Sequence, residues 1–171
     1  AQPGIFWLEN PGGQSEVWPR RLIGGKGHQV MFLSLGDLSG TNARNIICPT
    51  LGGDLLYLAR GKSGKWNESA ISLPFGLTAG KGVSIADVNL DGRADLVTTS
   101  ESQREAADMI AVAWKENTPD GWIDHAISDQ HGRKFDRLEM LDLDGDGDLD
   151  LLTCEEVDNL GVFWYENPTR K

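Results

Sequence analysis

The sequence has little cysteine and no long hydrophobic run. Two cysteines, Cys48 and Cys154, occur among its 171 residues, which is too few for a disulfide framework. Each cysteine lies in a short apolar segment, so we expect both to be buried free thiols. No apolar run approaches the roughly 18 residues that cross a bilayer, and we therefore expect no membrane span.

Basic residues are also scarce. The chain has 16 Lys plus Arg against 26 Asp plus Glu, a formal net charge of −10. A field of this sign repels phosphate, so we do not expect nucleic acid as a partner. No nucleophile elbow, phosphate-binding loop or zinc-ligand spacing is found in the sequence. Glycine, in contrast, is abundant at 21 residues, and acidic, glycine-rich domains of this length often bind cations.

Three sequence features recur with a period of about fifty residues, which is typical of repeat folds. The first is an aromatic residue in an apolar segment, at Trp7, Tyr57, Trp114 and Trp164. The second is a tryptophan followed five residues later by isoleucine, at Trp18/Ile23, Trp66/Ile71 and Trp122/Ile127. The third is the start of a polar loop, at Asp37, Asp87 and Asp142.

Each repeat unit is predicted to form four short strands. Segments such as 83–86, 96–99, 109–114 and 122–127 alternate or are apolar and are bounded by turn residues. The best helix candidate is 102–108, in an insertion that lengthens one unit. Repeated units of four antiparallel strands are typical of β-propeller blades, so we predict an all-β fold in a single domain. We place a partial unit at 1–23 and further units at 24–72, 73–128 and 129–171.

The phase of the repeat predicts an incomplete ring. The chain starts with the third and fourth strands of a unit and ends with the first three, which gives about three blades and one duplicated strand. Propellers typically have about four to eight blades, so three cannot close, and an open arc exposes sheet edges. Either this is part of a larger propeller or a homo-oligomer completes the ring. The duplicated strand favours the larger propeller.

Two of the acidic loops have the oxygen ligands that calcium prefers. Both fit the pattern Asp-x-Asp/Asn-x-Asp-Gly-x-x-Asp, with ligands expected at positions 1, 3, 5 and 9 and a backbone carbonyl at position 7. The glycine permits the sharp turn, and carboxylates this close repel one another without a cation. We therefore expect about two Ca²⁺ ions, held by Asp142, Asp144, Asp146, Asp148 and Asp150 in the last unit, and by Asp87, Asn89, Asp91, Arg93 and Asp95 in the unit before it.

The loop at 37–45 differs, and we expect no ion there. It keeps one carboxylate of the four, and Arg44 adds a positive charge. An EF-hand is the obvious competitor for the other two loops, but it needs glutamate at position 12 and flanking helices. Position 12 is Thr98 in one loop and Thr153 in the other, and the flanking segments are predicted strands.

The segments 142–152 and 87–97, with the Phe-Trp-x-Glu-Asn-Pro strands at 6–11 and 163–168, resemble the VCBS/FG-GAP repeat family. These are calcium-binding propeller blades that also form the heads of integrin α-subunits. The resemblance covers nearly the whole chain and implies that the acidic loop joins the first and second strands of each blade. Bacterial members are mostly exported, which implies an extracellular or periplasmic location. The resemblance says little about activity, because one fold carries many functions.

The loops at the other end of the units carry bases and acids. We expect these groups to be unpaired and to lie opposite the calcium loops, with His131, Arg133 and Glu155 as candidates for a ligand or catalytic site. Ordinary charged loops are the alternative interpretation. His125 and the six repeat-phased tryptophans are expected to serve packing.

Two functions remain open. The first, which we favour, is a calcium-binding module that presents a loop face to a glycan or protein. The second is a carbohydrate-active enzyme, a lyase, dehydratase or hydrolase, with its site on the channel face opposite the calcium loops, where a histidine near carboxylates could abstract a proton.

Overall fold

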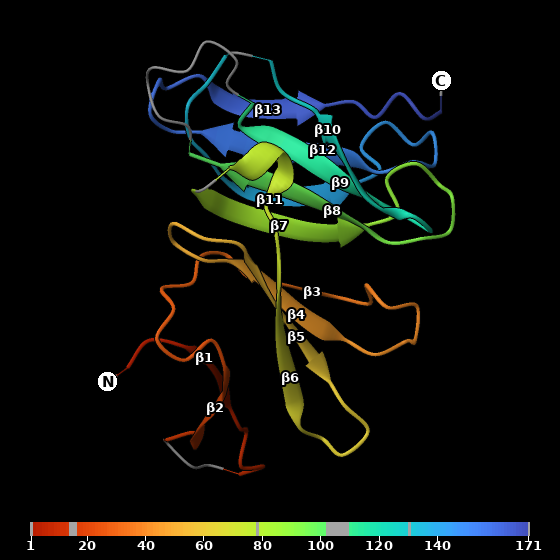
Figure 1. The fold of residues 1–171 in the computed structure, drawn as a ribbon. Coiled ribbons are helices and arrows are strands. Elements are labelled where there is room, and N and C mark those ends of the chain that lie inside the picture. The colour runs from red at the N-terminus through yellow and green to blue at the C-terminus, as the bar shows by residue number, and fades with distance from the viewer. Residues whose placement is uncertain (1, 14–16, 78, 102–109, 130, 171) are drawn as a thin grey trace.

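The computed structural model describes residues 2–13, 17–77, 79–101, 110–129 and 131–170, and this part of the chain is all-β. It forms four antiparallel sheets and one short 3-10 helix, η1 (Pro74–Gly76) (Figure 1). The helix candidate at 102–108, and residue 109 at the start of a predicted strand, lie outside the described residues. Among the described residues, no helix has the length and hydropathy that crossing a bilayer requires.

The strands divide among four sheets, here numbered I to IV. Sheet I contains β1 (Ile5–Leu8) and β2 (Arg20–Gly24). Sheet II contains β3 (Ser34–Gly36), β4 (Asn45–Pro49), β5 (Leu55–Arg60) and β6 (Trp66–Ile71). Sheet III contains β7 (Gly80–Ala86), β8 (Asp95–Ser100), β9 (Val112–Thr118) and β10 (Gly121–Ala126). Sheet IV contains β11 (Phe135–Leu141), β12 (Asp150–Glu155) and β13 (Gly161–Tyr165).

Within each sheet, neighbouring strands are consecutive in the chain. The sheets therefore follow the predicted repeat units. Sheets II and III each have four strands in sequence order. Sheet I has two strands and sheet IV has three, as expected for a chain that starts with the last two strands of a unit and ends with the first three. The all-β prediction is confirmed, and the described sheets do not close into a ring.

The four sheets pack face to face through strands that are buried on both sides. On β4, Ile46 belongs to a cluster with Ile5 of sheet I, whereas Ile47 belongs to a cluster with Val83 of sheet III. Successive side chains of a strand point to opposite faces, so neighbouring residues reach different sheets. A third cluster joins sheet III to sheet IV around Phe135, which is fully buried. This explains the continuous apolar runs in the second strand of each unit.

A glycine lies where the first strands of sheets III and IV meet. A Cβ atom at Gly82 would lie 2.7 Å from the backbone oxygen of Asp136 on β11 and 2.7 Å from the Thr99 hydroxyl. Any larger residue would therefore push β7 away from β11. The Gly82 N–H donates to the Thr99 Oγ1 atom at 2.9 Å, which further fixes this contact.

The strand registers place the recurring residues at equivalent positions of each sheet. Tyr57, Trp114 and Trp164 lie opposite Ile47, Val97 and Leu152, respectively. The equivalent positions two residues earlier are Leu55, Val112 and Val162. Leu55 and Val112 are fully buried, whereas Val162 is 73% exposed. No described sheet covers the outer face of sheet IV, so Val162 and Trp164 are exposed there.

The absence of a covering sheet over sheet IV also explains why one cysteine is buried and the other is exposed. Cys48 is buried, as predicted, and burial together with the nearby charge of Glu68 raises the pKa of its thiol to about 11. Cys154 is exposed, so the prediction for it was wrong. Its equivalents, Pro49 and Thr99, are buried under the following sheet, but Cys154 lies on the uncovered outer face of sheet IV.

The native protein should therefore label at one thiol. We expect Cys154 to react with a thiol reagent within minutes at pH 8, whereas Cys48 reacts only on unfolding, because it is buried and almost wholly protonated. The measurement is the number of labelled sites by mass spectrometry before and after denaturant. Cys154→Ser should abolish the fast phase, and rapid labelling of both cysteines in the native wild type would contradict the assignment.

Candidate metal centre

The acidic loops all lie on one side of the molecule. They follow β3, β7 and β11 and join the first strand of each sheet to the second. In Figure 1 they project to the right, beyond the ends of these strands. This is the place that the repeat spacing predicts for them.

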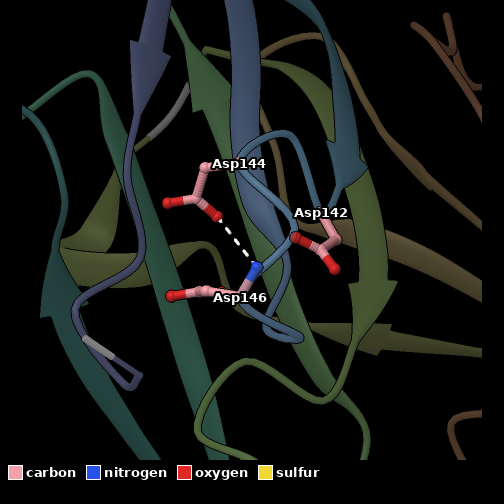
Figure 2. A group of neighbouring side chains, drawn as sticks. All are labelled: Asp142, Asp144 and Asp146. Atoms are coloured by element: carbon pink, nitrogen blue, oxygen red, sulfur yellow. Dashed lines mark hydrogen bonds between the residues drawn. The ribbon is translucent and has the colours of Figure 1, made fainter.

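Three carboxylates gather in the loop between β11 and β12. Asp142, Asp144 and Asp146 each offer an oxygen atom, and these atoms lie within 4.8 Å of one another (Figure 2). The Oδ1 atom of Asp144 accepts the backbone N–H of Asp146 at 3.2 Å, and the two Asp142 oxygens accept the N–H groups of Gly145 at 2.8 Å and Gly147 at 3.2 Å. Backbone donors thus hold the carboxylates in place.

Two glycines allow this loop to curl around its carboxylates. Gly145 has a φ of 84° and Gly147 a φ of 95°, in the left-handed region that other residues enter only with strain. In these conformations both N–H groups reach the side chain of Asp142.

The seventh residue of the loop, Asp148, is a buried carboxylate with a raised pKa. It is 1% exposed, and its Oδ2 atom accepts the backbone N–H of Arg170 at 2.7 Å. Its Oδ1 atom is buried and has no hydrogen-bond partner among the described residues. Burial raises the pKa of Asp148, and the charges of Asp146, Asp150 and Asp144 raise it further. A buried carboxylate oxygen without a donor is costly. Asp148 is not among the three residues whose oxygens gather within 4.8 Å.

The ninth residue of the loop has a different role from the first, third and fifth. Asp150 is buried, and its two oxygens accept the backbone N–H groups of Asn167 at 2.8 Å and Leu143 at 3.1 Å. Asp95 does the same in sheet III, with Asn117 at 2.8 Å and Val88 at 3.0 Å. Each carboxylate oxygen keeps a second lone pair, so metal ligation by these residues stays a prediction.

A recurring asparagine completes this arrangement, and sequence reasoning did not assign it a role. The Nδ2 atom of Asn117 donates to the backbone oxygen of Ala94 at 3.1 Å, and that of Asn167 donates to Leu149 at 3.1 Å. Asparagine therefore ties the end of the third strand to the acidic loop. The recurring Glu-Asn pair in the sequence is the signal from which this role could have been predicted.

The loop at 87–95 already contains a cation from the protein itself. The Arg93 guanidinium forms an ion pair with Asp91, and its Nε atom donates to the backbone oxygen of Asn117 at 2.5 Å. Asn89 donates to Asp91 at 3.2 Å and to Glu116 at 3.1 Å. The sequence interpretation used Arg93 only for its backbone carbonyl. A calcium ion at Asp91 would compete with this side chain.

The loop at 37–45 is closed by hydrogen bonds. Asp37 accepts the backbone N–H and the hydroxyl of Ser39, at 3.1 and 2.9 Å, and also the N–H of Asn42. Asn45 occupies the ninth position and is buried. The single carboxylate is thus satisfied by donors of the loop, and the expectation of no ion here remains a prediction.

At the opposite end of sheet IV, Glu155 holds a loop together. It is 3% exposed and accepts backbone N–H groups from the segment before β11 and from the loop between β12 and β13, namely those of Arg133, Lys134, Val157, Asp158 and Leu160. Burial acts to raise the pKa of Glu155, but these donors outweigh it and the pKa is lowered. Buried backbone donors need acceptors, and Glu155 supplies them.

The expectation of unpaired bases and acids at this end was wrong. Arg133 is paired with Asp158, with Nε–Oδ distances of 2.8 and 2.9 Å. His131 is exposed, and its Nδ1 atom lies 2.8 Å from the Oδ2 atom of Asp129. Arg133 lies beside Glu155, whose Oε1 atom accepts its backbone N–H at 3.1 Å, but its guanidinium contacts Asp158. Among the described residues, the hydrogen-bond partner of the His131 ring is Asp129.

The aromatic predictions are met in part. His125 stacks on Trp114 with ring centroids 4.4 Å apart, and its Nε2 atom lies 2.8 Å from Glu116, which agrees with a structural role. Trp66 and Trp114 pack against core clusters. The other four tryptophans are 37–47% exposed because they lie at sheet edges or on the terminal sheets, namely Trp7, Trp18, Trp122 and Trp164.

Replacing Glu155 should destabilise the fold in a pH-dependent way. We expect Glu155→Gln to lower the unfolding free energy at pH 7 by about 1–3 kcal/mol, because the amide meets the backbone donors with one acceptor fewer. A lowered pKa in the folded state stabilises above the unfolded value of 4.5, and this stabilisation is lost as the pH falls through the folded pKa.

Denaturant titrations between pH 7 and pH 3 measure this effect. The difference between wild type and variant should be full at pH 7 and should shrink in the acid range. Glu156→Gln is the matched control, because this neighbouring carboxylate is exposed and its partner among the described residues is Lys134. Equal losses in the two variants would contradict the role of Glu155.

In comparisons with known proteins, the chain matches no protein-family model and no curated protein.

Proposed function

We propose that this chain is a calcium-binding domain built from propeller blades of the VCBS/FG-GAP type. The observation that carries the proposal is the loop between β11 and β12. There, three aspartates gather within 4.8 Å and a fourth has a buried oxygen without a donor among the described residues. Hard oxygen donors on a glycine-containing turn are the ligand type that calcium takes.

The architecture supports the blade interpretation. Sheets II and III repeat the same four-stranded order, and β7 packs between β4 and β11. The acidic loop joins the first two strands in each case, and the buried aspartate at its ninth position makes the same backbone contacts in sheets III and IV. A repeat of both strand order and loop geometry is what a repeat family requires.

Calcium would act as a structural ion here. Bound by Asp142, Asp144 and Asp146, with Asp148 and Asp150 beside them, it would neutralise part of the −10 charge and link the end of β11 to the start of β12. The asparagine and aspartate contacts already hold the loop ends in place, so the ion would add to a preformed site. An extracellular or periplasmic location fits this proposal, because calcium modules outside the cell bind at about 10⁻⁴–10⁻³ M.

The domain would present its opposite loop face, at 127–134 and 156–160, to a glycan or protein. We favour this over a carbohydrate-active enzyme because of the contacts of the candidate catalytic groups. Arg133 is engaged with Asp158, and Glu155 accepts several backbone N–H groups. Residues held in this way position loops and are poorly placed to transfer protons.

Calcium should stabilise the protein through this loop. We expect millimolar calcium to raise the melting temperature relative to a chelator, because the ion binds the folded state preferentially. Asp146→Asn should abolish most of this increase. The matched control is Asp54→Asn, which removes an exposed carboxylate outside the acidic loops and should leave the response unchanged.

Thermal unfolding with calcium, magnesium and chelator gives the measurement. An unchanged melting curve on addition of calcium would overturn the metal assignment. An equal response in wild type and Asp146→Asn would show that calcium acts elsewhere.

The two acidic loops should differ in affinity. The loop at 142–150 should bind the first ion. In the loop at 87–95 the amide of Asn89 replaces one carboxylate, and Arg93 already forms an ion pair with Asp91. Arg93→Gln should therefore tighten the second binding event, since it removes the competing charge. Isothermal titration calorimetry measures both events. A single class of equal sites in wild type, unaffected by Arg93→Gln, would contradict this ranking.

A further inference from the structure

The segment at 167–170, which follows β13 and is here called the strap, contacts the two acidic loops that carry candidate metal ligands. Its first contacts are with the loop of its own sheet. The Asn167 N–H donates to the Oδ1 atom of Asp150 at 2.8 Å. The Arg170 N–H donates to the Oδ2 atom of Asp148 at 2.7 Å. Two buried carboxylates of this loop thus anchor the strap.

The strap also reaches the loop at 87–95 of sheet III. The Nδ2 atom of Asn167 donates to the backbone oxygen of Val88 at 2.9 Å, and the Thr169 hydroxyl donates to the same oxygen at 3.3 Å. Val88 is 8% exposed, belongs to the core cluster between sheets III and IV, and donates its own N–H to Asp95 at 3.0 Å. This residue is therefore held through its side chain, its N–H and its oxygen.

The position of Val88 matters for the curl of the whole loop. Val88 lies directly between Asp87 and Asn89, the first and third residues of the acidic pattern. The two oxygens of Asp87 accept the N–H groups of Asp91 at 3.0 Å and Gly92 at 2.9 Å. Because the backbone at Val88 sets where the Asp87 side chain lies, the strap also stabilises these hydrogen bonds.

In the described part of the chain, the loop ends of sheets II and III are not joined in this way. Asn117 occupies in sheet III the position that Asn167 occupies in sheet IV, and its Nδ2 atom donates to Ala94 of its own sheet at 3.1 Å. Among the described residues, no hydrogen bond runs from 117–121 to the loop at 37–45. The strap therefore links one pair of acidic loops and leaves the third as an internal reference.

We propose that the strap couples the loops at 87–95 and 142–150, so that they open and close together. If the loop at 142–150 opens, Asp148 and Asp150 no longer anchor the strap, and the two donors to Val88 lose their positions. The same hydrogen bonds are lost when the loop at 87–95 opens first, so the coupling is reciprocal. It depends on hydrogen bonds of the protein itself and requires no cation.

The coupling has a consequence for the candidate calcium sites, and this consequence rests on the proposed function. An ion bound in one loop holds that loop closed, and through the strap it lowers the ordering cost of the other loop. The first ion should therefore order the second site before an ion enters it.

Hydrogen exchange of the full-length protein in chelator measures the coupling without metal. The reporters are the amides of Asp91 and Gly92, whose hydrogen bonds to Asp87 break when the loop opens. Asp148→Ala removes a strap anchor in the other loop, and the reporters should exchange about two- to tenfold faster, the effect of losing about one hydrogen bond. Asp144→Asn changes the same loop at a residue whose described hydrogen bond is not to the strap, and it should leave the reporters unchanged.

A second set of variants disconnects the strap from the loop at 87–95. Thr169→Val keeps the shape of an exposed side chain and removes its donor, and Asn167→Ala removes the other donor to Val88. In the variant with both changes, the further change Asp148→Ala should have no additional effect on the reporters, because the connection between the loops is already broken.

The loop at 37–45 controls for general destabilisation. The Ser39 N–H donates to Asp37 at 3.1 Å, and its exchange reports opening of this loop alone. Ser39 should exchange at the wild-type rate in every variant. An equal acceleration at Ser39 and at the reporters would show that the variants only weaken the fold, and it would overturn the proposal.

A calcium arm separates the coupling from the proposed function. In Asp91→Ala, which removes a candidate ligand at 87–95, millimolar calcium should slow the exchange of Gly92 through the strap. The additional changes Asn167→Ala and Thr169→Val should abolish this slowing. Calcium that protects the loop at 142–150 but not Gly92 would overturn the coupling. Calcium that protects neither loop would refute the proposed function, while the exchange rates in chelator still decide on the strap.

Two further results would overturn the proposal. The first is an unchanged exchange rate of the reporters in Asp148→Ala. The second is an acceleration by Asp148→Ala that persists when both donors to Val88 are absent.

Discussion

A buried carboxylate accepts hydrogen bonds from two neighbouring segments at the loop end of sheets III and IV. Asp95 and Asp150 each start the second strand, and each accepts one N–H from the residue two positions after the first strand and one from a residue at or just after the end of the third. Three strand ends are thereby fixed relative to one another by one side chain. Such a group is costly to leave unsatisfied, so the loop geometry and the strand ends depend on each other. These hydrogen bonds hold the acidic loop in position without a bound cation.

This constraint explains why loops of different composition keep the same place. With the ends of the loop fixed, the first, third and fifth residues are free to vary in charge. Asp142, Asp144 and Asp146 leave a cluster of negative charge in sheet IV, whereas Arg93 provides an internal cation in sheet III. The same backbone thus supports an acidic cluster in one unit and a loop with an internal ion pair in the other.

Much of the fold could be predicted from the sequence because the repeat reports strand order and loop position directly. What it could not report is which sheet covers which residue. Cys154 lies in an apolar run like Cys48, yet it is exposed because no described sheet follows sheet IV. Arg133 and Glu155 read as free loop charges, but their pairing depends on strands far apart in sequence. The role of Asn117 and Asn167 could not be predicted for the same reason. In the sequence, an asparagine in a turn looks the same as one whose side chain bonds a strand end to a loop.

The position of each sheet in the stack also sets its resistance to local opening. Sheet III is covered on both faces, by sheets II and IV, whereas sheet I has two strands and one covered face. In a linear array each unit is stabilised by its own contacts and by those with its neighbours, so the inner units open least often. Among the described sheets, sheets II and III, which are packed on both faces, should therefore open least often. The loop at 142–150 belongs to sheet IV, whose outer face no described sheet covers, so an ion bound there would strengthen a sheet with fewer packing contacts than sheet III.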